Sequence, residues 1–378
     1  MTAAHARFAP SSAHRWGPGG CPGSVPMEEE HPEDGESEAA KEGTAAHWFL
    51  TEQFSTGEIH SVGTLAPNGV PVSAEMVEAC EMLRDDLLPT MEEPTGRLLV
   101  ERKLPASVMV HKDNWGTPDF YFIDEVNRVL TVWDYKYGHR YVDAFMNWQM
   151  MNYAMLILSA HDVDEWDKWR ITLKIAQPRN YSPEGPLRSW YLSGSELNKH
   201  ALSLRNSARV ANEPGAELRS GQHCRDCKAA HVCPALQRAA MSAVDLSYRQ
   251  TSVDMPPEAV GLELRILDAA DKRLSARRDA LEAHALGIIA RGGNVPGWQR
   301  THVKGRAKWT APLQSVLSLG NLYGKLLAKP VEAVTPAQAI KLGVDADLVA
   351  AYSSAESGAA KLQIADDRSA AKTFGSRQ

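Results

Sequence analysis

The chain has 378 residues, a formal net charge of -6, 43% hydrophobic residues and 23% charged residues. This length suffices for one large domain or two ordinary ones, and the composition is that of a globular protein. The sequence has no run of about 18 apolar residues and no apolar signal stretch near its start, which argues against a membrane span and predicts a cytoplasmic protein.

The acidic charge is concentrated in one segment. Residues 28–38 hold seven Asp and Glu side chains and no Lys or Arg. Removing these seven charges from a net of -6 leaves +1, so the rest of the chain can present local basic surfaces. We expect 28–38 to be an exposed loop, within a flexible N-terminal segment 1–36.

The predicted elements follow in chain order. Helical spacing of apolar residues predicts helices over 37–50 and 73–88, and Pro89 and Pro94 then bracket a loop. The periodicity then changes, and segments separated by turn residues predict strands over 97–104, 107–111, 119–124 and 128–135. A helix over 143–159 and a strand over 170–177 come next. This order predicts an α/β core with a mixed central sheet flanked by helices, extending over 37–240.

The C-terminal part is predicted to be a mainly helical accessory region, 241–352, followed by a disordered tail, 353–378. A long amphipathic helix is expected over 256–291, ended by two glycines. Its apolar stripe comprises Val260, Leu264, Leu267, Leu274 and Leu281. A later group interleaves basic and aromatic side chains, which suits either a single-strand nucleic-acid surface or a hairpin with a solvated basic face: Trp298, Lys304, Arg306, Lys308 and Trp309.

Two short motifs suggest a metal site. Asp119 follows a turn and enters an apolar strand, and Asp134 lies near the end of the strand predicted over 128–135. Lys136 falls two residues after Asp134 and therefore on the same face. If the two strands pair, the two carboxylates converge and suit Mg²⁺ or Mn²⁺. Taken one motif at a time, there is a simpler explanation: Asp119 would cap a turn, and Asp134 with Lys136 would form a surface ion pair at the end of a strand.

Other side chains are weaker candidates for the same site. Glu101, inside a predicted strand, is either a further acidic ligand or an exposed edge residue. Gln149 and Tyr153 share one face of the predicted helix 143–159, where they could reach the site or form a buried pair. His47 is a plausible ligand for Mn²⁺, although a lone histidine is more often only a satisfied side chain.

Five cysteines are present, and three of them form a tight cluster: Cys224, Cys227 and Cys233. Three thiolates in ten residues can bind Zn²⁺ or an iron–sulfur cluster, with one more ligand required. His223 or His231 as the fourth ligand would favour zinc, whereas Cys21 would favour a four-cysteine [4Fe–4S] site. Cys80 lies in an apolar helical stretch and is expected in the core.

The motifs together resemble the RecB-type branch of the PD-(D/E)XK nucleases. The resemblance covers roughly 11–240 and rests on residues 43–47, the Gly-Thr-Pro-Asp sequence ending at Asp119, the Asp-Tyr-Lys sequence starting at Asp134, and 149–153. The chain is most similar to the iron–sulfur subgroup, which includes CRISPR-adaptation exonucleases and AddB-type helicase-nuclease subunits. In that subgroup one cysteine precedes the core and three follow it. A phage and prophage family of uncharacterised RecB-like proteins also looks similar.

The resemblance implies a restriction-endonuclease-like fold and a metal-dependent DNA exonuclease or end-processing nuclease, encoded by a phage and acting in recombination, replication or repair. It implies that His47, Asp119 and Asp134 bind the metal and that Lys136 is catalytic. Gln149 and Tyr153 would contact the site or the DNA, and Glu101 and Glu42 are possible additional residues. A helicase or annealing protein is a possible partner. The alternative is a non-catalytic DNA-binding or scaffold protein with a structural zinc or iron–sulfur site.

Overall fold

The computed structural model describes residues 6–31, 38–58, 60–180, 184–247, 255–301, 313–322 and 346–352. The chain divides into two compact units, Met1–Pro296 with Arg368–Gln378, and Gly297–Asp367. The first unit therefore extends beyond the expected core boundary at residue 240 and includes the long helix. The predicted tail, 353–378, and the basic-aromatic group from Lys304 to Trp309 lie outside the described residues.

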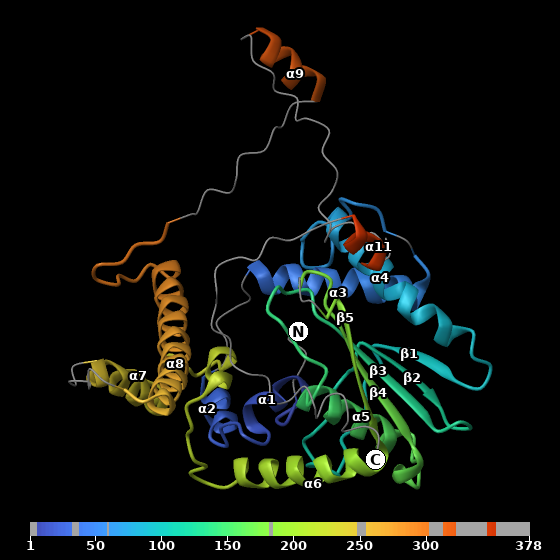
Figure 1. Cartoon of the computed structure of the whole chain (residues 1–378), viewed down its shortest axis with the longest axis horizontal. Helices are drawn as coiled ribbons and strands as arrows, with labels where there is room; N and C mark the ends of the chain where they lie inside the picture. Colours follow the sequence, from blue (N-terminus) through green and yellow to red (C-terminus); the bar gives the residue numbers. More distant parts are fainter. Residues whose placement is uncertain are drawn as a thin grey trace. The chain divides into compact units, whose positions relative to one another are not determined.

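A five-stranded mixed sheet forms the centre of the first unit, with strand order β1-β2-β3-β4-β5 (Figure 1). All neighbours are antiparallel except β3 and β4, which are parallel. The strands are β1 (Arg97–Val100), β2 (Phe120–Asp124), β3 (Val129–Tyr135), β4 (Arg170–Ala176) and β5 (Leu187–Ser193). The expected α/β class with a mixed sheet is confirmed.

Helices cover both faces of the sheet. The helices of the first unit are α1 (Ala13–Trp16), α2 (Ser24–Glu30), α3 (Glu38–Thr56), α4 (Ala74–Met91), α5 (Trp148–Ala160), α6 (Gly194–Ala211), α7 (Pro234–Ser247) and α8 (Pro257–Ala290). Short 3₁₀ helices are η1 (Pro10–Ser12), η2 (Trp166–Lys168) and η3 (Gln222–Asp226). The second unit contains α9 (Leu313–Leu322) and α11 (Ala346–Ala351). Among the helices described, none combines the length and apolar character needed to cross a membrane.

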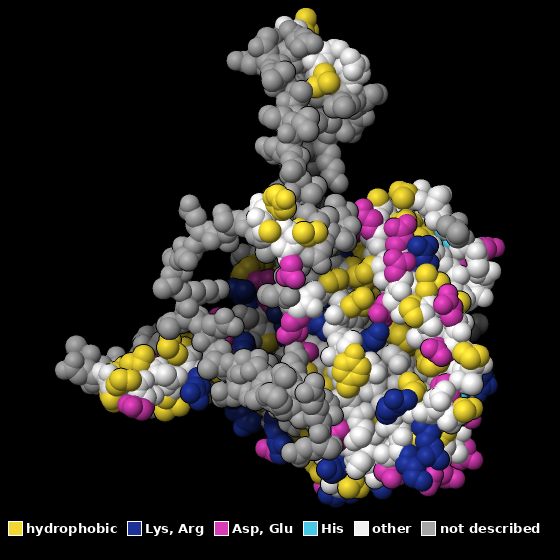
Figure 2. Space-filling view, turned by 45° about the vertical axis from the view of Figure 1, so that its right-hand side comes forward, with side chains coloured by type: hydrophobic (Ala, Val, Ile, Leu, Met, Phe, Trp, Pro, Cys, Tyr) yellow, Lys and Arg dark blue, Asp and Glu magenta, His cyan; other side chains and the backbone are white. Residues whose placement is uncertain are grey.

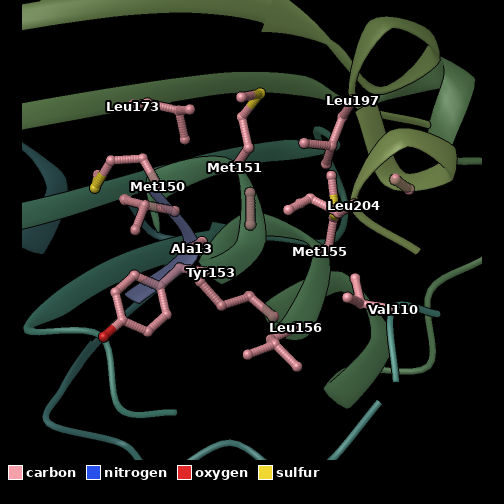
Figure 3. Close-up of a cluster of buried hydrophobic side chains, with 14 of the residues drawn as sticks. Ala13, Val110, Met150, Met151, Tyr153, Met155, Leu156, Leu173, Leu197 and Leu204 are labelled. Carbon is pink, nitrogen blue, oxygen red and sulfur yellow. The ribbon is translucent and has the colours of Figure 1, made fainter. Parts of the chain in front are cut away.

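The alternation of side chains along each strand builds two separate cores. On one face, Tyr121 and Val132 pack with α5 and α6. Figure 3 shows this core, with Met151 and Met155 of α5 beside Leu197 and Leu204 of α6. On the other face, side chains of β2 and β3 pack with α3 and α4, and Cys80 is buried there as expected. Residues of odd number on β2 and even number on β3 therefore face α5.

Several local predictions are wrong. Residues 108–110 form a turn rather than a strand, because the Ser107 hydroxyl accepts a hydrogen bond from the Met109 amide and Val108 points into solvent. Pro89 lies inside α4, which continues to Met91. Strand β1 ends at Val100, since Glu101 adopts a left-handed conformation with φ 45°.

The N-terminal segment also differs from the prediction. Phe8 and Trp16 are buried in the core with α5, so residues 6–31 are folded onto the sheet layer rather than loose. Glu28 belongs to α2 rather than to a loop, and its carboxylate pairs with Arg15 at 2.9 Å. The acidic run is therefore divided: its first three residues are helical, and 32–37 lie outside the described residues.

Candidate metal centre and cysteine site

The two acidic motifs meet because β2 and β3 pair in antiparallel register. Phe120 is opposite Trp133, so the register continues to place Asp119 opposite Asp134 at the end of the strand pair. The Asp119 carboxylate accepts a hydrogen bond of 2.6 Å from the Tyr135 amide, which fixes it against β3. The convergence expected from the sequence is present.

Asp134 lies in a network on the α5 side of the sheet. Its Oδ1 accepts hydrogen bonds from Gln149 Nε2 at 2.7 Å and from Lys136 Nζ at 3.0 Å. Lys136 Nζ also donates to Gln149 Oε1 at 3.3 Å. The buried Oδ2 lies 2.9 Å from Nζ as an ion pair but accepts no hydrogen bond in the described residues, so it retains lone pairs for another ligand.

Helix α5 brings two polar side chains to this network. The Asn147 side chain caps the helix by accepting hydrogen bonds from the Gln149 and Met150 amides, which places Gln149 in the first turn. Tyr153 lies one turn later and is buried. Its ring is so close to Gly116 that a Cβ there would meet Cε1 at 3.0 Å, so the glycine of the Gly-Thr-Pro-Asp motif makes room for Tyr153.

A second group of ligand atoms lies beside Asp119. The ligand atoms of His47, Glu101 and Asp119 lie within 4.8 Å of one another, a separation that one metal ion can span. His47 comes from α3 and its Nδ1 is 3.6 Å from Asp119 Oδ1. Glu101 follows β1, and its amide donates a hydrogen bond of 2.9 Å to the Asp119 carbonyl. Three elements therefore supply two carboxylates and one imidazole.

Burial and the close approach of Asp119 and Asp134 shift the pKa values of groups around them. Burial raises the pKa of Asp134, Lys136 lowers it in part, and the Asp119 charge raises it further. Burial would lower the pKa of Lys136, but the carboxylates of Asp134 and Asp119 outweigh burial and raise it. Burial, and then the charges of Asp119 and Asp134, raise the pKa of Tyr153. The Tyr153 hydroxyl therefore stays neutral and keeps its proton for a hydrogen bond. A divalent cation would relieve the repulsion between the acids.

The four clustered cysteines form a separate site. Cys21, Cys224, Cys227 and Cys233 line one cavity, although Cys21 lies about 200 residues before the others. All four are free thiols. Burial raises the pKa of Cys21 and of Cys224, and raises that of Cys227 to about 12. These thiols would therefore become ligands only with a strongly binding metal that displaces their protons.

Backbone amides already point at two of the sulfurs. The Arg219 amide donates to Cys21 Sγ at 3.2 Å, and the Gly221 amide donates to Cys224 Sγ at 3.3 Å. Such hydrogen bonds favour the thiolate form. Among the described groups of three ligand atoms within 4.8 Å, none consists of cysteines.

The comparison with protein families gives one result. A family model described as "Protein of unknown function (DUF2800)" matches residues 5–320, which is most of the chain. The chain belongs to the DUF2800 family. The matched range contains both sites, from Cys21 through the metal centre to Cys233. The DUF2800 region also continues through α8 and reaches α9.

Not every predicted residue of this DUF2800 protein lies at a site. The Glu42 carboxylate pairs with Arg179 at 2.9 Å and is not in the group around Asp119. His231 does not line the cysteine cavity but stacks on His284, whereas His223 does line it. Of the alternatives for a fourth ligand, Cys21 and His223 are therefore both in place.

One connection between the two sites was not predicted. Arg140 donates two hydrogen bonds, of 2.7 and 2.9 Å, to the carboxylate of Asp226, which lies between Cys224 and Cys227. Arg140 comes four residues after Lys136. Its only sequence signal is the basic character of the loop 138–141, because a pairing over 86 residues leaves no local pattern.

A pH-dependent effect is expected at Glu101. Restricted solvation, and then the Asp119 charge, raise the pKa of Glu101 from 4.5 to about 7, although the side chain reaches solvent. Between these pH values the unfolded chain has released a proton that the folded state retains, so stability falls as pH rises. Without metal, Glu101→Gln should therefore have a higher melting temperature than wild type at about pH 8, and the same melting temperature as wild type at about pH 5.

Differential scanning fluorimetry with a chelator, over this pH range, measures the effect. Adding Mn²⁺ should raise the melting temperature of wild type more than that of Glu101→Gln, since the variant lacks one anionic ligand. If the melting temperatures of the two proteins change in the same way with pH and with added Mn²⁺, Glu101 belongs neither to the charge cluster nor to a metal site.

Proposed function

We propose that this protein is a metal-dependent deoxyribonuclease that hydrolyses phosphodiester bonds, with a restriction-endonuclease-like core of the PD-(D/E)XK type. One observation carries the proposal: strand pairing places Asp119 opposite Asp134, with Lys136 and Gln149 bonded to the second acid. Paired carboxylates on adjacent strands with a lysine two residues later match the arrangement that this nuclease class requires. The sequence resemblance to the RecB-type branch supports the same assignment.

The donor set fits Mg²⁺ or Mn²⁺. Asp119 and Asp134 offer oxygen ligands, Glu101 a third carboxylate, and His47 an imidazole that Mn²⁺ accepts readily. A bound metal would supply charge neutralisation at the phosphate and a more acidic water. The protein's own groups orient this chemistry: Gln149 holds Asp134 and accepts from Lys136, so the ammonium group is fixed beside the carboxylate where it can contact the phosphate or the water.

The cysteine site fits a structural [4Fe–4S] cluster, with zinc as the alternative. Four thiols from the two ends of the core line one cavity, and two already accept backbone hydrogen bonds. The cluster would join residues before the sheet to residues after it. Because this part of the chain surrounds the core, we assign the cluster a role in stability rather than in electron transfer.

The proposal is tested with purified full-length protein on linear double-stranded, linear single-stranded and closed circular DNA. We expect Mn²⁺ or Mg²⁺ to support degradation of linear DNA, and a chelator or Ca²⁺ to prevent it. Sparing of circular DNA would identify an exonuclease, whereas nicking of circles would identify an endonuclease. Binding of DNA without metal-dependent degradation of any substrate would overturn the proposal and favour a scaffold that only binds DNA.

A further inference from the structure

Helix α8 carries an apolar face that neither proposed site uses. Its side chains are between 37% and 56% exposed: Val260, Leu264, Leu267, Leu274 and Leu281. The helix extends for 34 residues beside the cysteine segment (Figure 1). The neighbouring α7 also exposes Met241 and Val244. Figure 2 shows hydrophobic side chains gathered on the surface at the lower left, in the region of α7 and α8. A row of exposed apolar side chains along one helix is a candidate interaction surface.

The exposed stripe lies opposite the face by which α8 packs on its own unit. Ala276 is 3% exposed and packs with Leu236 and the cysteines. Arg277 donates hydrogen bonds to the carbonyl groups of Ala230 and His231, which anchors the same side. Leu267 precedes Ala276 by nine residues, which is about two and a half helical turns and therefore the opposite side of the helix.

The spacing of the stripe is that of a coiled coil. Val260, Leu267, Leu274 and Leu281 follow one another at strict intervals of seven residues, and Leu264 lies four residues after Val260. A seven-residue repeat keeps the seam against a second helix, whereas a helix on a globular surface follows a period of 3.6.

The charges within the stripe indicate which helix is the partner. In this register, Asp271 and Arg278 occupy successive a positions between the leucines. In a parallel pair of α8 helices, each of these charges would meet its own copy, which repels. In an antiparallel pair whose two-fold axis passes beside Leu274, Asp271 of one copy lies opposite Arg278 of the other. The stripe can therefore be complementary to itself in the antiparallel direction, but not in the parallel one.

We propose that α8 is a self-association surface, through which two copies of this chain pair by an antiparallel, two-stranded seam. The arrangement has two-fold symmetry, so each copy offers the same stripe and no further copy can be added. Since Ala276 faces the cysteine segment and the stripe faces away from it, pairing leaves the packing around Cys224 and Cys233 intact. Because two chains must meet to form the seam, the fraction of dimer should increase with protein concentration.

Sedimentation velocity of the full chain, from low to high micromolar concentration, tests the proposal. Wild type should shift from monomer to dimer. Leu267→Lys with Leu274→Lys should raise the dissociation constant by at least about 100-fold. Both leucines are exposed in the single chain, so the variant should keep the wild-type melting temperature. The matched control is Leu262→Lys, since Leu262 is 59% exposed on the same helix but outside the stripe.

Charge exchange tests the antiparallel direction. Asp271→Arg alone should weaken the dimer, because two arginines then meet across the seam. Adding Arg278→Asp should restore dimerisation, whereas in a parallel pair the double exchange keeps the like-charge contacts and restores nothing. A wild type that stays monomeric throughout, or a dimer unaffected by Leu267→Lys with Leu274→Lys, would overturn the proposal. Equal weakening by Leu262→Lys would also overturn it, because the contact would then lie on another face.

Discussion

Replacing Asp134 by Asn is expected to slow metal-dependent DNA cleavage by on the order of 10³-fold. The change keeps the shape of the side chain and its hydrogen bond from Gln149, so the network around Oδ1 persists. It removes the negative charge that pairs with Lys136 and that would help to hold a divalent cation. Cleavage of end-labelled linear DNA, at saturating Mn²⁺ and under single-turnover conditions, measures the chemical step.

A loss of stability must be separated from this loss of activity. Without the charge of the Asp134 carboxylate, the Lys136 ammonium group keeps neutral hydrogen-bond acceptors but loses its nearest counter-charge next to the core. Adding Lys136→Met to Asp134→Asn removes the ammonium charge and should recover most of the melting temperature without recovering activity. Glu125→Gln is the control, because this exposed acid lies just beyond the other end of β2. Full activity in Asp134→Asn would place the chemistry elsewhere.

The sheet and the juxtaposition of Asp119 with Asp134 could be predicted because their signals are local. Strands β2 and β3 are short, mainly apolar runs bounded by turn residues, and β3 begins within one residue of its predicted start. The pairing of Asp119 with Asp134 needed only one assumption, that consecutive strands are neighbours. The start of α5 was predicted several residues early, because Asn147 caps the helix and the preceding residues form an irregular loop.

The missed elements have two different causes. Strand β5 and helix α6 follow the predicted strands, and α6 has a local signal that the prediction missed, the capping box of Ser193 and Glu196. The burial of Phe8 and Trp16 has no such signal, since Ala, Pro and Gly around them resemble a loose terminus. Long-range packing against α5 overrides that local composition.

The two sites also differ in how far the sequence defines them. The spacing of Cys224, Cys227 and Cys233 predicts a metal site, but only the fold shows that Cys21 and His223 line the same cavity. For the metal centre, the sequence left Glu101 and His47 as open alternatives, and the turn after β1 together with the position of α3 brings both beside Asp119. Short sequence motifs therefore indicate the type of each candidate site, whereas the fold determines which distant residues complete it.

Replacing Cys224 by Ser is expected to lower the melting temperature by on the order of 10 °C, and to remove visible absorbance near about 400 nm. The proposed cluster would link Cys21 to Cys224, closing a loop of roughly 200 residues, and a cross-link of that span destabilises the unfolded chain by about 5 kcal/mol. The variant leaves three thiols in a buried cavity without a complete ligand set. Its core would still fold through the two hydrophobic clusters on the sheet.

Anaerobic purification, absorption spectra and iron and zinc analysis, followed by thermal melts, measure this effect. Cys80→Ser is the matched control, because Cys80 is equally buried but packs with α3 and α4 away from the cavity. It should retain the chromophore and the metal content. A colourless wild type with one zinc per chain would replace the cluster by the zinc alternative. Equal melting temperatures for metal-loaded and metal-free wild type would refute a structural role, because a group that binds only the folded state must stabilise it.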